Sequence, residues 1–268
     1  MLFKTILAGA ITILPMLAKA SNLLNYVYFP EGNIPPIVRV ETNLEVPQGY
    51  DVQSAQWVAF HFNIGSFYLA NDYNDKKSLR FWMNNNGGDT SVELVKVGED
   101  GDSTSSGWIN AGIPFDWRAG VQYRLRLDLE FIHNDAVFTT YVKDGSEWQL
   151  VSSIRGRNFG RYNLLSDYQM VQKILNPTNQ MAAGIFSEMT YRVLDDDFNY
   201  PNFGFYMDFT QVDQSQCWGY GITDNGVGTW MSVGGYNKTS QYCNRNDASW
   251  YSYNHCTVNK FTEKFNQA

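Results

Sequence analysis

The sequence predicts an all-β protein that folds as a β-sandwich, and three observations lead to that fold class. Residues 121–131, VQYRLRLDLEF, alternate apolar and polar side chains without a break, which is the period of a strand with one buried side. Aromatic residues make up 16% of the 268 residues, and they favour pleated, half-buried surfaces. Short apolar runs follow one another, separated by turn sequences such as NNNGGD, HND and KDGS.

Taken in order, the mature chain begins with an irregular segment, 22–36, which Pro30, Pro35 and Pro36 interrupt. We expect one short helix at 166–176, where Ser166 suits the N-cap and Pro177 ends the segment. Short strands are expected at 37–46, 56–64, 66–70, 78–84, 91–98, 121–131, 136–143, 147–154, 181–193 and 203–212.

Residues 1–20 have the features of a secretory signal peptide. Lys4 supplies the positive start, residues 5–17 form an apolar run too short to span a bilayer, and Ala18-Lys19-Ala20 fits the cleavage pattern. The sequence therefore predicts a secreted, extracellular protein that begins at Ser21 and has no membrane insertion after cleavage. The alternative is an uncleaved membrane anchor.

The net charge excludes some partners. The whole chain has a net charge of −7, and removal of Lys4 and Lys19 leaves 18 basic against 27 acidic residues, a net charge of −9. An acidic protein is a poor general binder of nucleic acid, so we expect no nucleic-acid partner.

The last part of the chain, 214–268, differs from the sandwich domain expected at 21–213. It is rich in Gly, Asn, Tyr and Trp, and it holds all three cysteines. It forms either a small appended lobe or extra strands of the sandwich. In an oxidising compartment one disulfide is expected, with Cys243–Cys256 favoured for its short loop and Cys217 with either partner as the alternative. Asn237 begins a glycosylation sequon.

Tryptophan and arginine on otherwise polar strand sides are the main sign of a ligand. In three strands the alternation assigns one wholly apolar side to the core, which leaves an aromatic ring or a guanidinium on the other side. Flat rings stack on sugar rings, and arginine and amide groups bond their hydroxyls. We therefore expect these residues to share one sheet face that binds an extracellular glycan or cell-surface polysaccharide: Trp57, His61, Arg80, Trp82, Asn84, Arg124 and Arg126.

No catalytic motif is present in the sequence. It lacks G-x-S-x-G, H-E-x-x-H and a P-loop, and it has no Glu-x-Asp-x-Glu strand pattern of sandwich glycosidases. Asp128 and Glu130 share a strand side with arginines, which is typical of a solvated charge ladder. The acidic run 195–197 is expected to be a solvated loop. A carbohydrate-binding module is thus favoured over its alternatives, a polysaccharide hydrolase or lyase and a structural or adhesion protein.

We expect no cofactor. The acidic loop 98–107, GEDGDSTSSG, offers Glu99, Asp100 and Asp102 to calcium but lacks EF-hand spacing.

Several motifs follow one another in a specific order over about residues 36–210, and the most distinctive are Trp117, Gly120, Tyr123 and Arg124, followed by Thr140-Tyr141 and Glu147-Trp148. This order resembles the secreted domain-of-unknown-function family 3472. It implies a concanavalin-like or jelly-roll β-sandwich and export, and no chemistry. The family's Gly-Gly-Glu-Gly-like loop is replaced here by the more acidic 98–107, and the cysteine-rich segment lies outside the resemblance.

Overall fold

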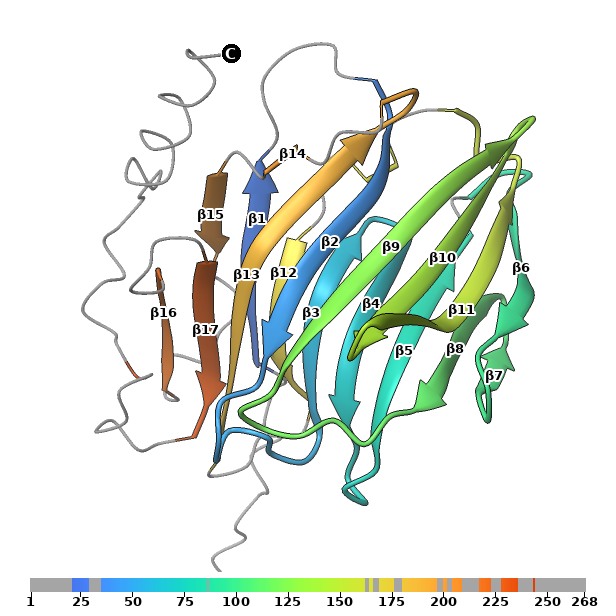
Figure 1. The fold of residues 1–268 in the computed structure, drawn as a ribbon. Helices are drawn as coiled ribbons and strands as arrows, with labels where there is room; N and C mark the ends of the chain where they lie inside the picture. Colours follow the sequence, from blue (N-terminus) through green and yellow to red (C-terminus); the bar gives the residue numbers. More distant parts are fainter. Residues whose placement is uncertain are drawn as a thin grey trace, which may run out of the picture.

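The fold is a sandwich of two antiparallel β-sheets, which Figure 1 shows with one sheet in front of the other. The structure is a computed structural model that describes residues 21–28, 35–85, 87–161, 164–165, 169–175, 180–196, 200–201, 204–208, 217–222, 228–235 and 243. Within these residues there is no helix, and so none long and apolar enough to cross a membrane.

Sheet A has eight strands. Their order is β15 (Gly204–Asp208), β1 (Ser21–Tyr28), β12 (Gln169–Ile174), β3 (Ala55–Phe62), β4 (Gly65–Asn71), β5 (Lys77–Asn84), β8 (Trp108–Pro114) and β7 (Asp102–Ser105).

Sheet B has nine strands. Eight run in the order β16 (Trp218–Ile222), β17 (Gly228–Gly234), β13 (Met181–Val193), β2 (Ile37–Glu45), β9 (Gln122–Ile132), β10 (Asp135–Asp144), β11 (Glu147–Arg157) and β6 (Ser91–Val97). The ninth, β14 (Tyr200–Pro201), pairs with β13.

Every predicted strand has a counterpart, but the predicted helix is wrong. Residues 169–174 form β12 between β1 and β3. Fully buried side chains occur at every second position of this segment, at Met170, Gln172 and Ile174, which is the period of a strand. Pairing on both edges outweighs a weak local preference for helix. The segment 22–36, expected to be irregular, contains β1, and β8 was not predicted.

Aromatic side chains from both sheets fill the space between them. The ring of Phe138 in β10 stacks on Phe62 in β3 at 5.7 Å between centroids and meets Phe81 in β5 at 6.5 Å. All three side chains are buried, and each contributes about 2–3 kcal/mol to folding. This packing fixes the inward side of β3, β5 and β10.

A bulge in β3 turns Trp57 into this core. The pairing of β3 with β4 shifts register between Val58 and Phe60, so residues on either side of the shift exchange faces. Trp57 is fully buried, donates from Nε1 to the carbonyl of Ala183 at 2.7 Å and meets Trp117 edge to face. The prediction that Trp57 lies on a ligand-binding face is therefore wrong.

The described part of the C-terminal segment adds strands to the sandwich. β17 pairs with β13 and β16 pairs with β17, so of the two alternatives the extra strands are observed. The disulfide joins Cys217 to Cys243, not Cys243 to Cys256. Pairing of β16 with β17 brings Cys217 beside Gly234 and Gly235, through hydrogen bonds of 2.9 and 2.8 Å. Residues 1–20, Asn237 and Cys256 lie outside the described residues.

Replacing Trp57 and Trp82 one at a time should distinguish a tryptophan of the core from one on the surface. We expect Trp57→Ala to lower the free energy of unfolding by about 3–5 kcal/mol, because it removes a large buried ring and leaves the Ala183 carbonyl without its donor. Trp82→Ala should cost less, because Trp82 is only partly buried on the outer side of sheet A. Urea unfolding of both variants measures the difference, and equal losses would contradict this assignment.

Candidate functional site

Polar side chains lie next to one another on the outer side of sheet B, across β2, β9 and β10. Opposite residues on these strands form three cross-strand rows, about 7 Å apart along the strands. The rows are Asn43–Arg124–Lys143, Glu41–Arg126–Tyr141 and Arg39–Asp128–Thr139. We call this surface the sheet B face.

A hollow of ≈ 730 Å³ opens on this face at its Arg39 end. It extends from β10 across β9 and β2 to the turn after β13. Polar and apolar groups line it: Val38, Arg39, Asp128, Leu129, Glu130, Phe131, Val137, Thr139, Tyr141, Arg161, Arg192, Val193, Leu194, Asp195 and Asp196. The lining combines charged and hydroxyl-bearing side chains with apolar ones, which suits a polyhydroxylated ligand better than a purely apolar one.

Arg39 and Asp128 fix the floor of the hollow. The two side chains form a bidentate pair, in which Arg39 Nη2 donates to Asp128 Oδ2 at 3.0 Å. Burial alone would lower the pKa of Arg39, but the hydrogen bond and charge of Asp128, together with Glu41, raise it above its ordinary value. Arg39 therefore keeps its charge and holds the Asp128 carboxylate in one orientation.

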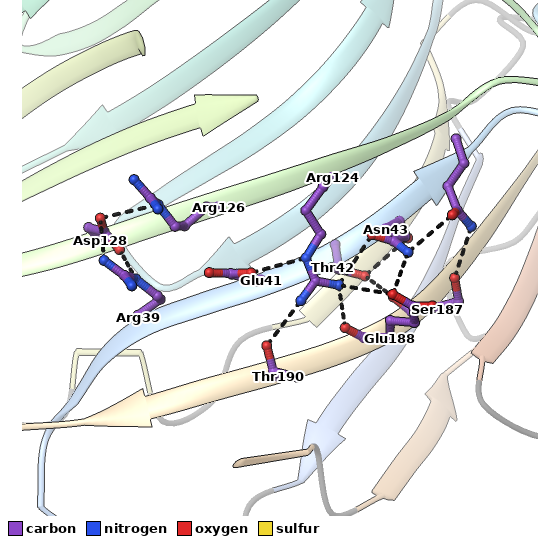
Figure 2. Close-up of polar contacts among 11 residues, drawn as sticks. Arg39, Glu41, Thr42, Asn43, Arg124, Arg126, Asp128, Ser187, Glu188 and Thr190 are labelled. Atoms are coloured by element: carbon purple, nitrogen blue, oxygen red, sulfur yellow. Dashed lines mark hydrogen bonds and ion pairs between the residues drawn. The ribbon is translucent and has the colours of Figure 1, made fainter. Parts of the chain in front are cut away.

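Arg124 ties three strands together beside the hollow (Figure 2). Its Nε donates to Glu41 at 3.0 Å on β2, and its Nη1 donates to the Glu188 carbonyl at 2.6 Å and Asn43 Oδ1 at 3.2 Å. Its Nη2 donates to Thr190 Oγ1 at 3.2 Å on β13. Every nitrogen of this guanidinium is thus bonded to the protein, and Arg124 is a structural residue.

The Arg124 contacts stabilise a bulge in β13. The register with β2 shifts between Ser187 and Thr190, and Glu188 has a left-handed backbone with φ of 48°. This conformation is costly for a residue with a Cβ, so it needs support from its neighbours. The hydrogen bond from Arg124 to the Glu188 carbonyl supplies that support, and Asn43 donates to the Glu188 carboxylate at 2.9 Å.

Arg126 has a different environment, although it lies only two residues further along β9. Its guanidinium carbon lies 4.4 Å from the ring centre of Tyr141 and 4.3 Å from that of Trp148. Its Nε lies 3.3 Å from Asp128 Oδ2, which is an ion pair without the alignment of a hydrogen bond. Contacts with two aromatic rings restrict the position of this arginine.

Four of the seven predicted ligand residues lie on the outer side of sheet A, not sheet B. His61, Arg80, Trp82 and Asn84 share that side, and His61 and Trp82 lie on either side of Ser66 in one row across β3, β4 and β5. This sheet A face also holds a small apolar cluster of Val58, Tyr68 and Val171, on which Trp82 packs.

Polar partners occupy much of the sheet A face. A ring nitrogen of His61, Nδ1, lies 2.6 Å from Ser66 Oγ, and Arg80 pairs with Asp102 at 2.6 Å. Burial first and the charge of Lys173 second lower the pKa of His61, which favours the neutral ring at pH 7. Asp102, which was considered above as a calcium ligand, lies at the start of β7 and is the partner of Arg80 in this ion pair. No group of three potential metal ligands occurs in the described ranges.

The expectation of one shared face is wrong. Arg124 and Arg126 lie on β9 in sheet B, while the strands of His61, Arg80, Trp82 and Asn84 lie in sheet A. The two outer sides point away from each other, so the predicted set divides between opposite surfaces. Alternation gave the correct outward residues of β5 and β9, but it carries no information about which sheet each strand joins.

Several residues of the hollow were not predicted. Arg39 and Tyr141 come from outward positions of 37–46 and 136–143, where alternation would have placed them on a surface. The acidic run 195–197 was expected to be a solvated loop, and Asp195 is indeed exposed in the turn after β13, where it lines the hollow together with Asp196. Only the adjacency of β13, β2, β9 and β10 brings these positions together.

Comparison with known proteins adds no identity: no family model matches the chain, and no curated protein matches it. The resemblance to the domain-of-unknown-function family 3472 stays a prediction.

The structural role of Arg124 is measurable against a matched arginine. Arg124→Ala should lower the free energy of unfolding by about 2–3 kcal/mol, because it leaves the largely buried Glu41 carboxylate unpaired and frees the β13 bulge. Arg157→Ala should change it by less than about 1 kcal/mol, since its pair with Glu93 is exposed. Urea unfolding of the two variants compares them, and equal effects would contradict the structural assignment of Arg124.

Proposed function

We propose that this protein is a secreted carbohydrate-binding β-sandwich whose glycan site is the hollow on the sheet B face. The observation that carries the proposal is the lining of the hollow, where charged and hydroxyl-bearing side chains occur together with the aromatic residue Tyr141. Tyr141 offers a ring and a hydroxyl, Thr139 a hydroxyl, and Glu130 an acceptor, all on neighbouring strands. This mixture of flat apolar surface and directional donors and acceptors suits sugar rings.

Rigidity of the lining supports the same proposal. Asp128 is held by Arg39, and Thr139 Oγ1 lies 3.0 Å from Ser153 Oγ, so polar groups of the hollow are oriented before a ligand arrives. A site with little freedom to lose retains more of its interaction energy on binding. The volume of ≈ 730 Å³ lies within the usual range for small-ligand sites.

The extracellular setting remains part of the proposal. The signal-like residues 1–20 imply export, and the Cys217–Cys243 disulfide is compatible with an oxidising compartment. A glycan on a cell surface or in an extracellular polymer is the ligand class that such a protein meets.

A glycan array on the mature protein tests this function. We expect binding that Tyr141→Ala weakens about fivefold or more, because an aromatic contact in a site contributes on the order of 1 kcal/mol. Tyr73→Ala is the matched control, since Tyr73 is 72% exposed in the turn between β4 and β5. Loss of binding in Trp82→Ala alone would move the site to the sheet A face, and an array without any binding would refute the function.

Hydrolysis of the bound glycan is a second candidate, favoured by carboxylates that reach the hollow from separate strands. Glu130 comes from β9 and Asp196 from the turn after β13, with β2 between them in the sheet. Glycosidases use two carboxyl groups that flank the bond to be cleaved.

Release of reducing ends from an array-positive glycan decides between binding and hydrolysis. If the protein is a hydrolase, Glu130→Gln should lower the rate at least 100-fold while leaving binding within about threefold, because general acid–base catalysis typically contributes that much. Glu147→Gln, at an exposed position at the start of β11, is the control. Binding without release of reducing ends leaves the binding module as the function.

A further inference from the structure

We propose that the glycan bound at the sheet B face is acidic, and that the terminal nitrogens of Arg126 bind the carboxylate of a uronic acid residue. This inference rests on the proposed function, because it names the class of sugar that the same site selects. It assigns a specificity-determining role to one arginine and withholds it from its neighbour Arg124.

The two arginines differ in what remains of their hydrogen-bonding capacity. All three nitrogens of Arg124 donate to the protein, so a ligand could bind it only by breaking existing bonds. Arg126 has no hydrogen bond to any residue in the described part of the chain, and of its three nitrogens only Nε is both buried and unbonded. Its Nη1 and Nη2 therefore retain some exposure to solvent and have unused donors, and two such donors of one guanidinium can bind a carboxylate through two bonds.

The surroundings of Arg126 hold those donors in place. Tyr141 and Trp148 contact its guanidinium, and its side chain is only 15% exposed. A freely rotating arginine side chain loses rotamer entropy when a ligand fixes it. Here the rings have already restricted the side chain, so the binding of an anion carries little of this cost.

The local charge also favours an anion at this position. Arg39 and Asp128 form a bidentate pair. Arg124 pairs with Glu41 through its Nε alone and lies 3.8 Å from Glu188 Oε2. Arg126 shares Asp128 with Arg39. Lys143, whose ammonium lies 6.0 Å from the Trp148 ring, forms no ion pair within the described residues. Two cations, Arg126 and Lys143, thus lie beside Trp148, and the carboxylate paired with Arg126 is shared with Arg39, although the chain as a whole is acidic.

Tyr141 connects this cationic group to the hollow. The ring that contacts Arg126 is also part of the hollow lining, and Arg126 and Tyr141 are direct partners in the pairing of β9 with β10. A sugar chain that lies in the hollow and extends past Tyr141 brings the next residue to Nη1 and Nη2. The site therefore selects a glycan with a carboxylate at that residue.

The experiment compares uronate-bearing oligosaccharides on an array, each printed as the free acid and as its methyl ester. Esterification removes the charge and one acceptor and leaves the ring unchanged. We expect the wild-type protein to bind the free acids about tenfold more tightly than the esters, and Arg126→Gln to reduce that ratio to about one. Arg157→Gln, which removes the same charge from an exposed position, should leave the ratio unchanged.

The outcomes separate this inference from the proposed function. Equal binding of acids and esters by the wild-type protein overturns the inference while the glycan site stands, and an array without any binding overturns both. Lys143→Gln gives a second test that leaves the Arg126 stack in place, and we expect it to lower the ratio about twofold to threefold. An unchanged ratio in a folded Arg126→Gln variant, checked by its thermal unfolding, would also refute the role of Arg126.

Discussion

Burial of aromatic rings between the two sheets is the constraint on which the rest of the structure depends. Phe138 contacts Phe62 and Phe81 from the opposite sheet and Phe159 from the turn after β11, so one cluster joins both layers. Because the side chains of a strand alternate, the strands that contribute these rings must direct their other residues outward. The polar sheet B face and the mixed sheet A face both follow from this packing.

Sequence alone predicted the strands well because alternation survives wherever a strand is regular. In β5 and β9 the inward and outward residues are those that the pattern gives, including Trp82 and Arg126. The pattern of hydrophobicity failed where a bulge shifts the period, or where a buried polar residue conceals it. Trp57 precedes the β3 bulge, and Gln172 is a buried amide in β12, so neither position reads correctly from hydrophobicity.

The candidate site was less predictable than the fold, because it depends on strand order. A polar residue at an outward position has the same sequence pattern whether its neighbours are solvent, a partner strand or a ligand. Arg124 and Arg126 illustrate this, since both lie on the same side of one strand. The bulge in β13 provides acceptors for Arg124, whereas β10 and β11 provide aromatic rings for Arg126. Residues 121–131 by themselves do not indicate which strands supply these neighbours.

Asp128 gives the sheet B face a dual character. Its carboxylate accepts two bonds from Arg39 at the floor of the hollow, and the same Oδ2 lies 3.3 Å from Arg126. Asp128 thus lines the hollow and also neutralises part of the positive charge of Arg126. Asp128, engaged by Arg39, lies beside the buried Nε of Arg126, while Nη1 and Nη2 of that guanidinium keep unused donors. The polar network that stabilises β2 against β9 is therefore also what orients the unused donors, so that stability and ligand selection on this face depend on the same contacts.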